Sequence, residues 1–220
     1  MTQNPTIPVI AIDGPSASGK GTVAQLVAQQ LGYHYLDSGA LYRIVAYAAK
    51  LQKISWQDAP AVAAIIDTLH IEFKYGDIFL NQQNVSDEVR SEEIGKGASQ
   101  VAVHPAVRDA LMDLQRSFRQ APGLVADGRD MGTVIFPDAG TKIYLTASAE
   151  IRAERRYKQL LAKGINADLL EILQDLKERD ARDQQRAAAP LMQAEDAELL
   201  ETNQLSISEA VEKVLQKVTK

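Results

Sequence analysis

Near its N-terminus the chain reads Val9-Ile10-Ala11-Ile12-Asp13-Gly14-Pro15-Ser16-Ala17-Ser18-Gly19-Lys20-Gly21-Thr22. A short apolar run ends in a loop bounded by Gly14 and Gly19, and Lys20 follows the loop directly. This spacing is typical of a phosphate-binding loop (P-loop), whose glycines let backbone N–H groups approach an anion. A helix after the loop would add free N–H groups and a positive dipole end. We therefore expect Lys20 to reach the outer phosphates of a bound nucleoside triphosphate.

The residues around the loop supply the strand–loop–helix order that the motif requires. Residues 9–12 predict a buried parallel strand. The next segment has one apolar helical face, formed by Val23, Leu26, Val27 and Leu31. One position departs from many P-loops, because Gly21 stands where a Ser or Thr commonly binds Mg²⁺ and Thr22 comes one residue later. The motif alone leaves open how a metal ion is held.

The length and amino-acid composition of the chain limit the classes of protein to which it can belong. A chain of 220 residues with ordinary apolar and charged fractions suits one domain with a modest insertion. The formal net charge of −5 argues against a general nucleic-acid coat protein, and the lack of cysteine excludes disulfides and thiol nucleophiles. No apolar run has the length of a membrane span, and residues 1–5 lack the features of a secretory signal. We expect a cytoplasmic protein, and its exposed charge favours a monomer.

Strands alternate with helices along most of the chain, which predicts a parallel sheet covered on both faces. Strands are expected at 9–12, 34–36, 124–126, 142–145 and 199–201. Helices are expected up to a C-cap at Gly32, at 40–50, 60–69, 90–101, 105–119, 150–163 and 168–180, and after a capping box formed by Ser206 and Glu209. A hairpin of 70–74 and 77–80, turning at Tyr75-Gly76, breaks this rhythm and predicts an inserted subdomain at about 60–100.

Polar residues follow the strand at 124–126. Asp127 occupies the place of a Walker B acid that holds Mg²⁺ or its waters, although it could also be a loop-starting aspartate. Arg129 and Asp130 lie on the same edge between two glycines, which favours a ligand loop over a surface ion pair. Ser38 could be a plain N-cap, and Arg43 alone says little.

Arginines gather in the last third of the chain. Arg152, Arg155 and Arg156 lie within one turn, and Arg179, Asp183 and Arg186 are spaced to share one helical face. A solvated, salt-bridged face is the ordinary explanation of such a pattern. However, guanidinium suits bidentate contact with phosphate, so beside a P-loop these arginines suggest a second phosphate-bearing ligand.

Together these parts resemble the nucleoside monophosphate kinases, and within them the bacterial cytidylate kinases. The blocks that carry the resemblance are residues 14–22, 36–43, 98–102, 127–133 and 177–190. Gly21 fits, because the P-loop of this family reads Gly-Lys-Gly-Thr. The resemblance implies the α/β P-loop nucleoside-monophosphate-kinase fold: a parallel sheet flanked by helices, a core at about 1–59, 101–150 and 190–220, a monophosphate-binding subdomain at about 60–100, and a short lid at about 151–189.

The resemblance also implies roles for single residues. Binding of ATP falls to Gly14, Pro15, Ser16, Ala17, Ser18, Gly19, Lys20, Gly21, Thr22 and Arg156. Binding of CMP falls to Ser38, Arg43, Ser99, Arg108, Arg129, Asp130, Arg179, Asp183 and Arg186. The catalytic residues would be Lys20, Arg129, Arg155, Arg179 and Arg186. The position of Asp127 at the end of a strand, more than the resemblance, makes it the residue expected to hold Mg²⁺ through water, and Thr22 in the P-loop is the second candidate.

The implied reaction transfers a phosphoryl group from ATP to CMP or dCMP in pyrimidine nucleotide metabolism. Because a phosphomonoester is largely doubly ionised at neutral pH (pKa about 6), the acceptor needs no general base. Three alternatives stay open. They are a kinase for another monophosphate, a kinase for a small-molecule hydroxyl group, and a nucleotide-gated switch without transfer chemistry.

Overall fold

The computed structural model describes residues 7–74 and 77–218. The chain divides into two units: the first contains Met1–Asp37 and Arg116–Lys220, and the second contains Ser38–Gln115. The second unit covers more of the chain than the inserted subdomain of about residues 60–100 that the hairpin predicted. It begins earlier because the helix α2 (Ser38–Leu51) packs against α5 (Glu92–Val101) and so belongs to the same unit.

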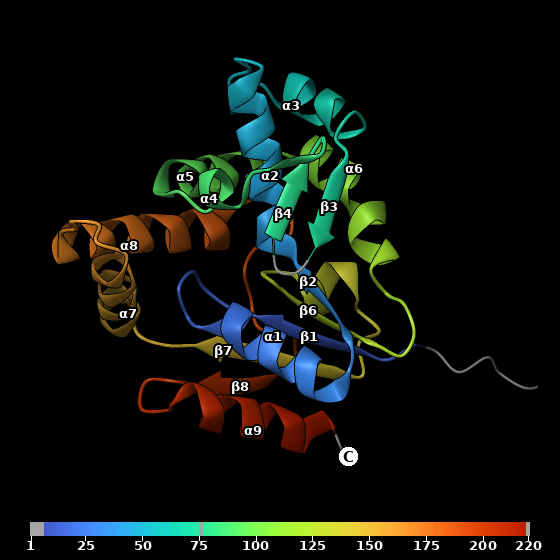
Figure 1. Ribbon diagram of the computed structural model, residues 1–220. Helices are drawn as coiled ribbons and strands as arrows, with labels where there is room; N and C mark the ends of the chain where they lie inside the picture. The colour runs from blue at the N-terminus through green and yellow to red at the C-terminus, as the bar shows by residue number, and fades with distance from the viewer. Residues whose placement is uncertain (1–6, 75–76, 219–220) are drawn as a thin grey trace, which may run out of the picture. The chain divides into compact units, whose positions relative to one another are not determined.

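A five-stranded sheet forms the centre of the first unit (Figure 1). Its strands are β1 (Val9–Asp13), β2 (His34–Asp37), β6 (Leu124–Gly128), β7 (Thr141–Thr146) and β8 (Glu198–Glu201). The order is β2-β6-β1-β7-β8, and every neighbouring pair is parallel. The expected parallel sheet is confirmed. Because β1 lies in the middle, the loop that follows it emerges at the centre of the carboxyl edge of the sheet.

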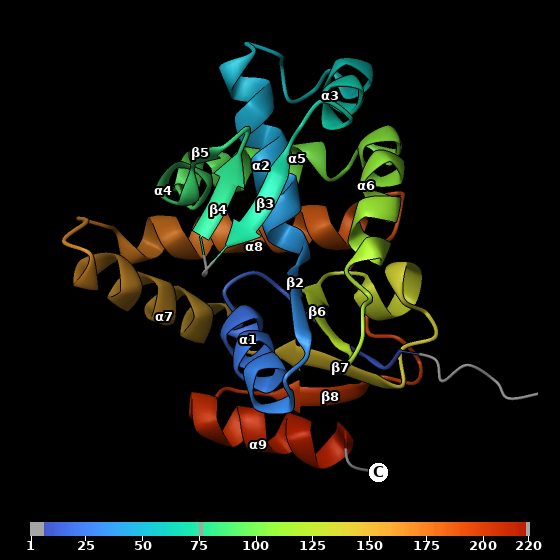
Figure 2. The same cartoon turned by 45° about the vertical axis from the view of Figure 1, so that its right-hand side comes forward.

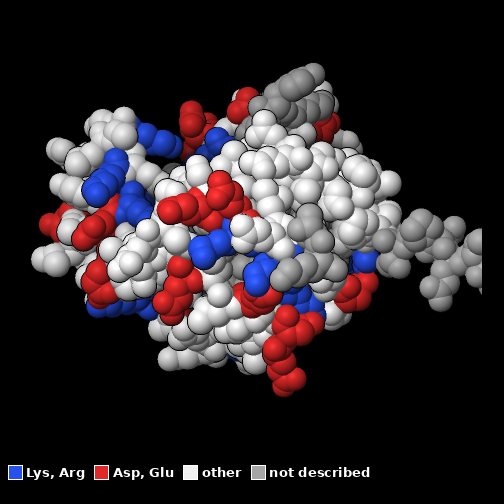
Figure 3. Space-filling view, turned by 90° about the horizontal axis from the view of Figure 1, so that it is seen from below, with Lys and Arg blue, Asp and Glu red and all other residues white. Residues whose placement is uncertain are grey.

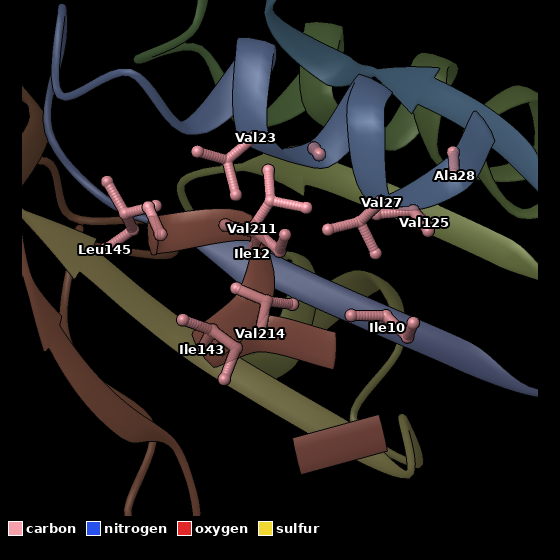
Figure 4. Packing of buried hydrophobic residues seen from close by; sticks show 12 residues of the cluster. Ile10, Ile12, Val23, Val27, Ala28, Val125, Ile143, Leu145, Val211 and Val214 are labelled. Atoms are coloured by element: carbon pink, nitrogen blue, oxygen red, sulfur yellow. The ribbon is translucent and has the colours of Figure 1, made fainter. Parts of the chain in front are cut away.

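Two helices far apart in sequence cover one face of this sheet. They are α1 (Lys20–Leu31) and α9 (Ile207–Val218), and Figure 4 shows their apolar side chains against β1, β6 and β7. Ile12 and Val27 are fully buried there, so truncating Ile12 to alanine is expected to cost about 2–5 kcal/mol. The packing fixes α1, and with it the loop at its N-terminus.

The ends of these helices agree with the sequence analysis. Gly32 closes α1 in the left-handed region, at φ 65°, and its N–H bonds to carbonyls of the last turn. Before α9, the backbone N–H of Ser206 donates to the Glu209 carboxylate at 2.8 Å, and the N–H of Glu209 donates to the Ser206 hydroxyl at 3.3 Å. The C-cap and the capping box are confirmed.

The helices α7 (Ala149–Ala162) and α8 (Leu169–Gln185) form a packed pair in the first unit (Figure 2). Ser148 and Asp168 cap their N-termini with side-chain oxygens. The predicted end of α8 near residue 180 was wrong, since no helix breaker occurs before Pro190 and the helix runs on to Gln185. Arg186 is its C-cap with extended backbone, so Arg186 lies beyond the helical face that carries Arg179 and Asp183.

A five-residue π-helix, η1 (Met131–Ile135), follows β6 and was not predicted. Its sequence, Met-Gly-Thr-Val-Ile, is rich in β-branched residues, which by themselves favour a strand. Backbone bonds of the segment itself run from Ile135 to Asp130 and from Phe136 to Met131, and Asp13 of β1 accepts the N–H groups of its first two residues.

The second unit combines helices with a three-stranded antiparallel sheet of order β3-β4-β5. Besides α2 and α5, its elements are α3 (Ala59–Ile66), β3 (Ile71–Lys74), β4 (Asp77–Leu80), β5 (Gln83–Asn84), α4 (Ser86–Val89) and α6 (Pro105–Ser117), whose last residues belong to the first unit. The expected hairpin is confirmed by β3 and β4, and its turn at Tyr75-Gly76 lies outside the described residues.

Several helix boundaries in this part of the chain differ from expectation by one to three residues. The helix expected at 90–101 begins at Glu92, because Ser91 caps it by accepting from the N–H of Ile94. The short α4 precedes it. Ser38 is the first residue of α2, not a cap outside it, and α3 ends at Ile66.

Charges of both signs are interspersed on the side of the molecule where α9 lies (Figure 3). This mixture agrees with the modest net charge of −5. In residues 7–74 and 77–218, helices that combine the length and the apolar character of a membrane span are absent.

Candidate active site

The P-loop has the backbone geometry that its glycines allow. Gly14 has a φ of 156°, and a Cβ atom there would overlap the carbonyl oxygen of Leu145 in β7. Gly19, at φ 92°, is the N-cap of α1, and its helix has neither a side-chain cap nor an acidic residue in its first turn. The N–H groups of this turn are therefore available to an anion, which the helix dipole also favours.

Two arginines of α7 hold the P-loop by its carbonyl oxygens. Arg152 donates from Nη1 to the oxygen of Ser16 at 3.0 Å, and Arg155 donates from Nη1 to the oxygen of Ser18 at 3.4 Å. Arg155 also bonds to Thr202, through the hydroxyl at 3.1 Å and the carbonyl at 2.5 Å. Segments more than 130 residues away in sequence thus support the loop.

Lys20 lies in a strongly charged environment at the start of α1. Burial and the nearby charge of Arg129 lower the pKa of Lys20 to about 8, against the opposing effect of the carboxylates of Asp127, Asp37 and Asp183. The ammonium group is surrounded by groups of both signs and remains charged at neutral pH.

Asp127 stands beside the P-loop, as the strand-end position predicts. It is paired in register with Asp37 on the neighbouring strand. Burial, with the charge of Asp37, raises the pKa of Asp127 to about 7, and Tyr35 donates its hydroxyl to Oδ1 of Asp127 at 3.3 Å. A Cβ atom on Gly21 would come within 3.3 Å of Oδ2 and 3.5 Å of the Tyr35 hydroxyl. Glycine at position 21 thus leaves room for this carboxylate.

Arg129 joins the P-loop to α8. Its Nε donates to Oδ2 of Asp183 at 2.7 Å, and its Nη2 donates to the hydroxyl of Ser16 at 2.7 Å. Burial opposes ionisation of both partners, but their mutual attraction outweighs it, so the pKa of Arg129 is raised and that of Asp183 is lowered. A second buried pair, Arg186 with Asp130, lies at 3.8 Å. The structure therefore brings together four residues predicted to bind CMP.

Asp13 ties the strand before the P-loop to the segment after Arg129 and Asp130. Its two carboxylate oxygens accept the N–H groups of Met131 and Gly132, each at 2.8 Å. Burial raises the pKa of Asp13 to about 6, although the two N–H donors act in the opposite direction. These bonds hold the N-terminus of η1, and π-turns of this kind often occur at functional sites.

Four more predicted residues belong to the second unit. Ser38 donates to Oε1 of Gln115 at 2.7 Å, and Arg43 donates to the carbonyls of Val89 and Ser91 at 2.9 and 3.0 Å. Arg108 lies with its guanidinium 5.9 Å from the centre of the Tyr42 ring and donates to the carbonyl of Ala102 at 3.5 Å. Ser99 is buried on α5.

Three other predicted residues lie on α1, α7 and α8. Thr22 is exposed in the first turn of α1, and Arg179 is half-buried on α8. Arg156 donates to Gln159 on its own helix at 3.4 Å, a contact that does not tie it to the P-loop.

Several residues that lie at the loop had no site role predicted from the sequence. They are Asp13, Tyr35, Arg152, Asp180 and Thr202. Arg152 was part of a noted cluster, but its partners could not be known. Thr202 follows the last strand, so its position at the carboxyl edge of a parallel sheet was the available signal.

The donor set at the sheet edge fits a Mg²⁺ ion that is shared with a nucleotide. Among the described residues, clusters of three or more His, Cys, Asp or Glu side chains able to hold a metal are absent. Mg²⁺ is usually held by one or two carboxylates together with substrate phosphates and water. Asp127, with Asp37 beside it, supplies such carboxylates next to Lys20.

Comparison with known proteins agrees with this geometry. The family model described as cytidylate kinase matches residues 10–220. A cytidylate kinase of Polynucleobacter asymbioticus is 62% identical over 95% of this chain and 95% of that protein. One of Burkholderia ambifaria is 60% identical over 95% and 92%. A solved structure of an uncharacterized protein from Eubacterium ventriosum, 11% identical with a TM-score of 0.51, covers 97% of this chain and 99% of that one and shares its fold. The chain belongs to the cytidylate kinase family.

Proposed function

We propose that the protein transfers the γ-phosphoryl group of ATP to CMP, and likewise to dCMP, giving ADP and CDP or dCDP. Membership of the cytidylate kinase family makes it a kinase that acts on nucleotides. The observation that carries the proposal within the structure is the contact of Arg129 with Ser16. It places a guanidinium, suited to an anionic acceptor, against the loop suited to a triphosphate donor.

The P-loop and Lys20 are assigned to ATP. Phosphoryl transfer depends on alignment and on neutralising charge, more than on covalent chemistry by the protein. N–H groups of the loop and the ammonium of Lys20 would bind the β- and γ-phosphates, in agreement with a pKa of Lys20 that leaves it charged at neutral pH.

Arginines are assigned to the acceptor. Arg129, Arg179 and Arg186 would offset the repulsion between two phosphates, with Asp130 and Asp183 orienting them. The resemblance assigns contacts with CMP to Ser38, Arg43, Ser99 and Arg108 as well. Because the acceptor oxygen is already ionised, the mechanism requires no general base.

Mg²⁺ belongs to the same proposal, with Asp127 holding it through water and Thr22 as the second candidate. When bound with ATP, the ion supplies positive charge to the β- and γ-phosphate oxygens. The protein side of this arrangement is the buried carboxylate of Asp127, which a cation would stabilise in its ionised form.

The pair α7 and α8 lies within the segment proposed as the lid over ATP, whose closure would exclude water as a competing acceptor. Arg156 is proposed to contact ATP. Arg155 is proposed to contact the transferred phosphoryl group, and for this its guanidinium would exchange its bonds with Thr202 for phosphate oxygens. We also propose that the protein acts as a monomer in the cytoplasm, where ATP and CMP are made and used.

The deciding experiment measures ADP production from ATP and Mg²⁺ with CMP, dCMP, UMP, AMP, GMP or cytidine as acceptor. We expect CMP and dCMP to give the highest kcat/KM. Faster reaction with AMP or GMP would identify a different monophosphate kinase, and reaction with cytidine would identify a hydroxyl kinase. Slow ATP hydrolysis that CMP leaves unchanged would identify a nucleotide switch. Any of these three results would overturn the proposal.

A further inference from the structure

Arg152 contacts the backbone of the P-loop from the side of α7. Its Nη1 donates to the carbonyl oxygen of Ser16 at 3.0 Å. In a planar trans peptide, the N–H of the following residue points opposite to that carbonyl. The bond from Arg152 therefore turns the N–H of Ala17 away from α7, toward the side of the loop that an anion occupies. Ala17 has a positive φ of 58°, which is an uncommon conformation for alanine.

The guanidinium of Arg152 is itself held on two other sides. Its Nε donates to the carbonyl of Ala147 at 2.9 Å, and its Nη2 donates to Oδ2 of Asp180 on α8 at 2.6 Å. The side chain of Arg152 is only 5% exposed, and that of Asp180 is 16% exposed. Because its three nitrogens donate to three fixed partners, the guanidinium of Arg152 cannot rotate freely. This rigidity suits it to hold a backbone orientation.

We propose that Arg152 is a positioning residue that fixes the Ser16–Ala17 peptide of the P-loop, and thereby the affinity for ATP, and that Asp180 holds Arg152 in place for this role. Arg152 acts through the loop and does not itself need to contact a substrate. Without its donor, the carbonyl of Ser16 could turn toward the bound phosphates, where an oxygen repels and an N–H attracts. The inference rests on the proposed function only in taking ATP as the ligand of the loop.

The test compares Arg152→Gln, Arg152→Lys and Asp180→Asn with the wild-type chain. Binding of ATP with Mg²⁺ and binding of CMP are measured separately by calorimetry. Loss of one charge-assisted hydrogen bond predicts that Arg152→Gln weakens ATP binding by about 10- to 100-fold. Binding of CMP should change by less than about threefold. Lys158→Gln, which removes one exposed charge from the same helix, is the matched control and should leave both affinities unchanged.

The two other variants separate geometry from charge. Arg152→Lys keeps the charge but loses the planar fork, so it should recover only part of the ATP affinity. Asp180→Asn keeps the size of the side chain but weakens the hold on Arg152, and a smaller loss of ATP affinity is expected. In steady-state kinetics, the KM for ATP should rise in all three variants while the KM for CMP stays constant.

Three results would overturn the inference. One is a folded Arg152→Gln protein, by circular dichroism and thermal unfolding, that binds ATP within twofold of wild type. Another is an equal loss of ATP and CMP affinity, which would indicate a general structural role. The third result applies if Arg152→Gln does not fold: ATP affinity that is unchanged in both Arg152→Lys and Asp180→Asn. ATP binding is measured without an acceptor, so the result is independent of which monophosphate the enzyme phosphorylates.

Discussion

The guanidinium of Arg129 and the carboxylate of Asp183 form a buried ion pair, in which Nε donates to Oδ2 over 2.7 Å. The pair connects the segment after β6 with α8. Arg129 also reaches the P-loop, so three parts of the first unit meet at one guanidinium.

Replacing Arg129 with alanine should reduce turnover by about 100- to 1,000-fold, because it removes a donor for phosphate in a buried site. It also leaves the carboxylate of Asp183 buried without its ion-pair partner, so some loss of thermal stability is expected. A coupled assay of ADP release measures the first effect, and circular dichroism shows whether the fold is intact. Arg182→Gln, which removes a partly exposed arginine of α8 that pairs with Glu178 at 3.9 Å, is the control. Turnover near the wild-type value would refute the role of Arg129.

Replacing Lys20 with methionine should reduce turnover by orders of magnitude without unfolding the protein. Because the pKa of Lys20 is lowered to about 8, the free enzyme loses this charge as the pH rises through 8. ATP binding should therefore weaken between pH 7 and pH 9.

Lys20→Arg provides the control for this pH effect, since guanidinium stays charged throughout that range. Its ATP affinity, whatever its absolute value, should change less with pH than that of the wild type. Equal slopes for the two proteins in calorimetric titrations would show that another group causes the dependence.

Tyr35 and Asp127 should together set the requirement for Mg²⁺. Asp127→Asn is expected to raise the Mg²⁺ concentration for half-maximal rate by about tenfold or more, since a carboxylate ligand is lost. Tyr35→Phe removes the donor to Oδ1 and should give a smaller rise of a few fold, as is usual for an outer-shell partner. Initial rates at saturating ATP measure this, and Tyr33→Phe serves as a control hydroxyl deletion. A Mg²⁺ dependence unchanged in Asp127→Asn would exclude Asp127 as the ligand.

Asp13 should make stability fall as the pH rises. Its pKa is about 6 in the folded protein and 3.8 in the reference state, so between these values the folded chain holds a proton that the unfolded chain releases. The stabilisation from this proton is complete below pH 4 and is lost as the pH rises through 6. It amounts to at most about 3 kcal/mol in the free energy of unfolding.

Urea unfolding of the wild type and of Asp13→Asn at several pH values between 4 and 7 isolates this effect. The variant cannot titrate at position 13. Its unfolding free energy should therefore increase relative to that of the wild type as the pH rises. A difference that stays constant over this range would contradict the assignment to Asp13.

Local sequence patterns predicted the sheet and the P-loop because both are encoded locally. Buried parallel strands are short apolar runs, and the loop is defined by the spacing of Gly14, Gly19 and Lys20. The resemblance added the order of the blocks, which is why Arg129, Asp183 and Arg186 could be named before their positions were known.

Contacts between distant segments could not be predicted from the same patterns. Arg152 lies 136 residues after Ser16, and an arginine on a charged helix gives no sign of which carbonyl it will reach. Similarly, the two N–H groups that Asp13 accepts belong to η1, whose β-branched residues gave no signal for a π-helix. Both features include hydrogen bonds between distant segments, which a local pattern does not contain.

Thr202, which bonds to Arg155 beside the P-loop, is synthesised 184 residues after Ser18 of that loop. A nascent chain still attached to the ribosome therefore lacks part of the scaffold around its triphosphate loop until β8 has emerged. A chain truncated before β8 would therefore contain the P-loop motif, but its Arg155 would lack the hydroxyl and carbonyl partners that Thr202 supplies.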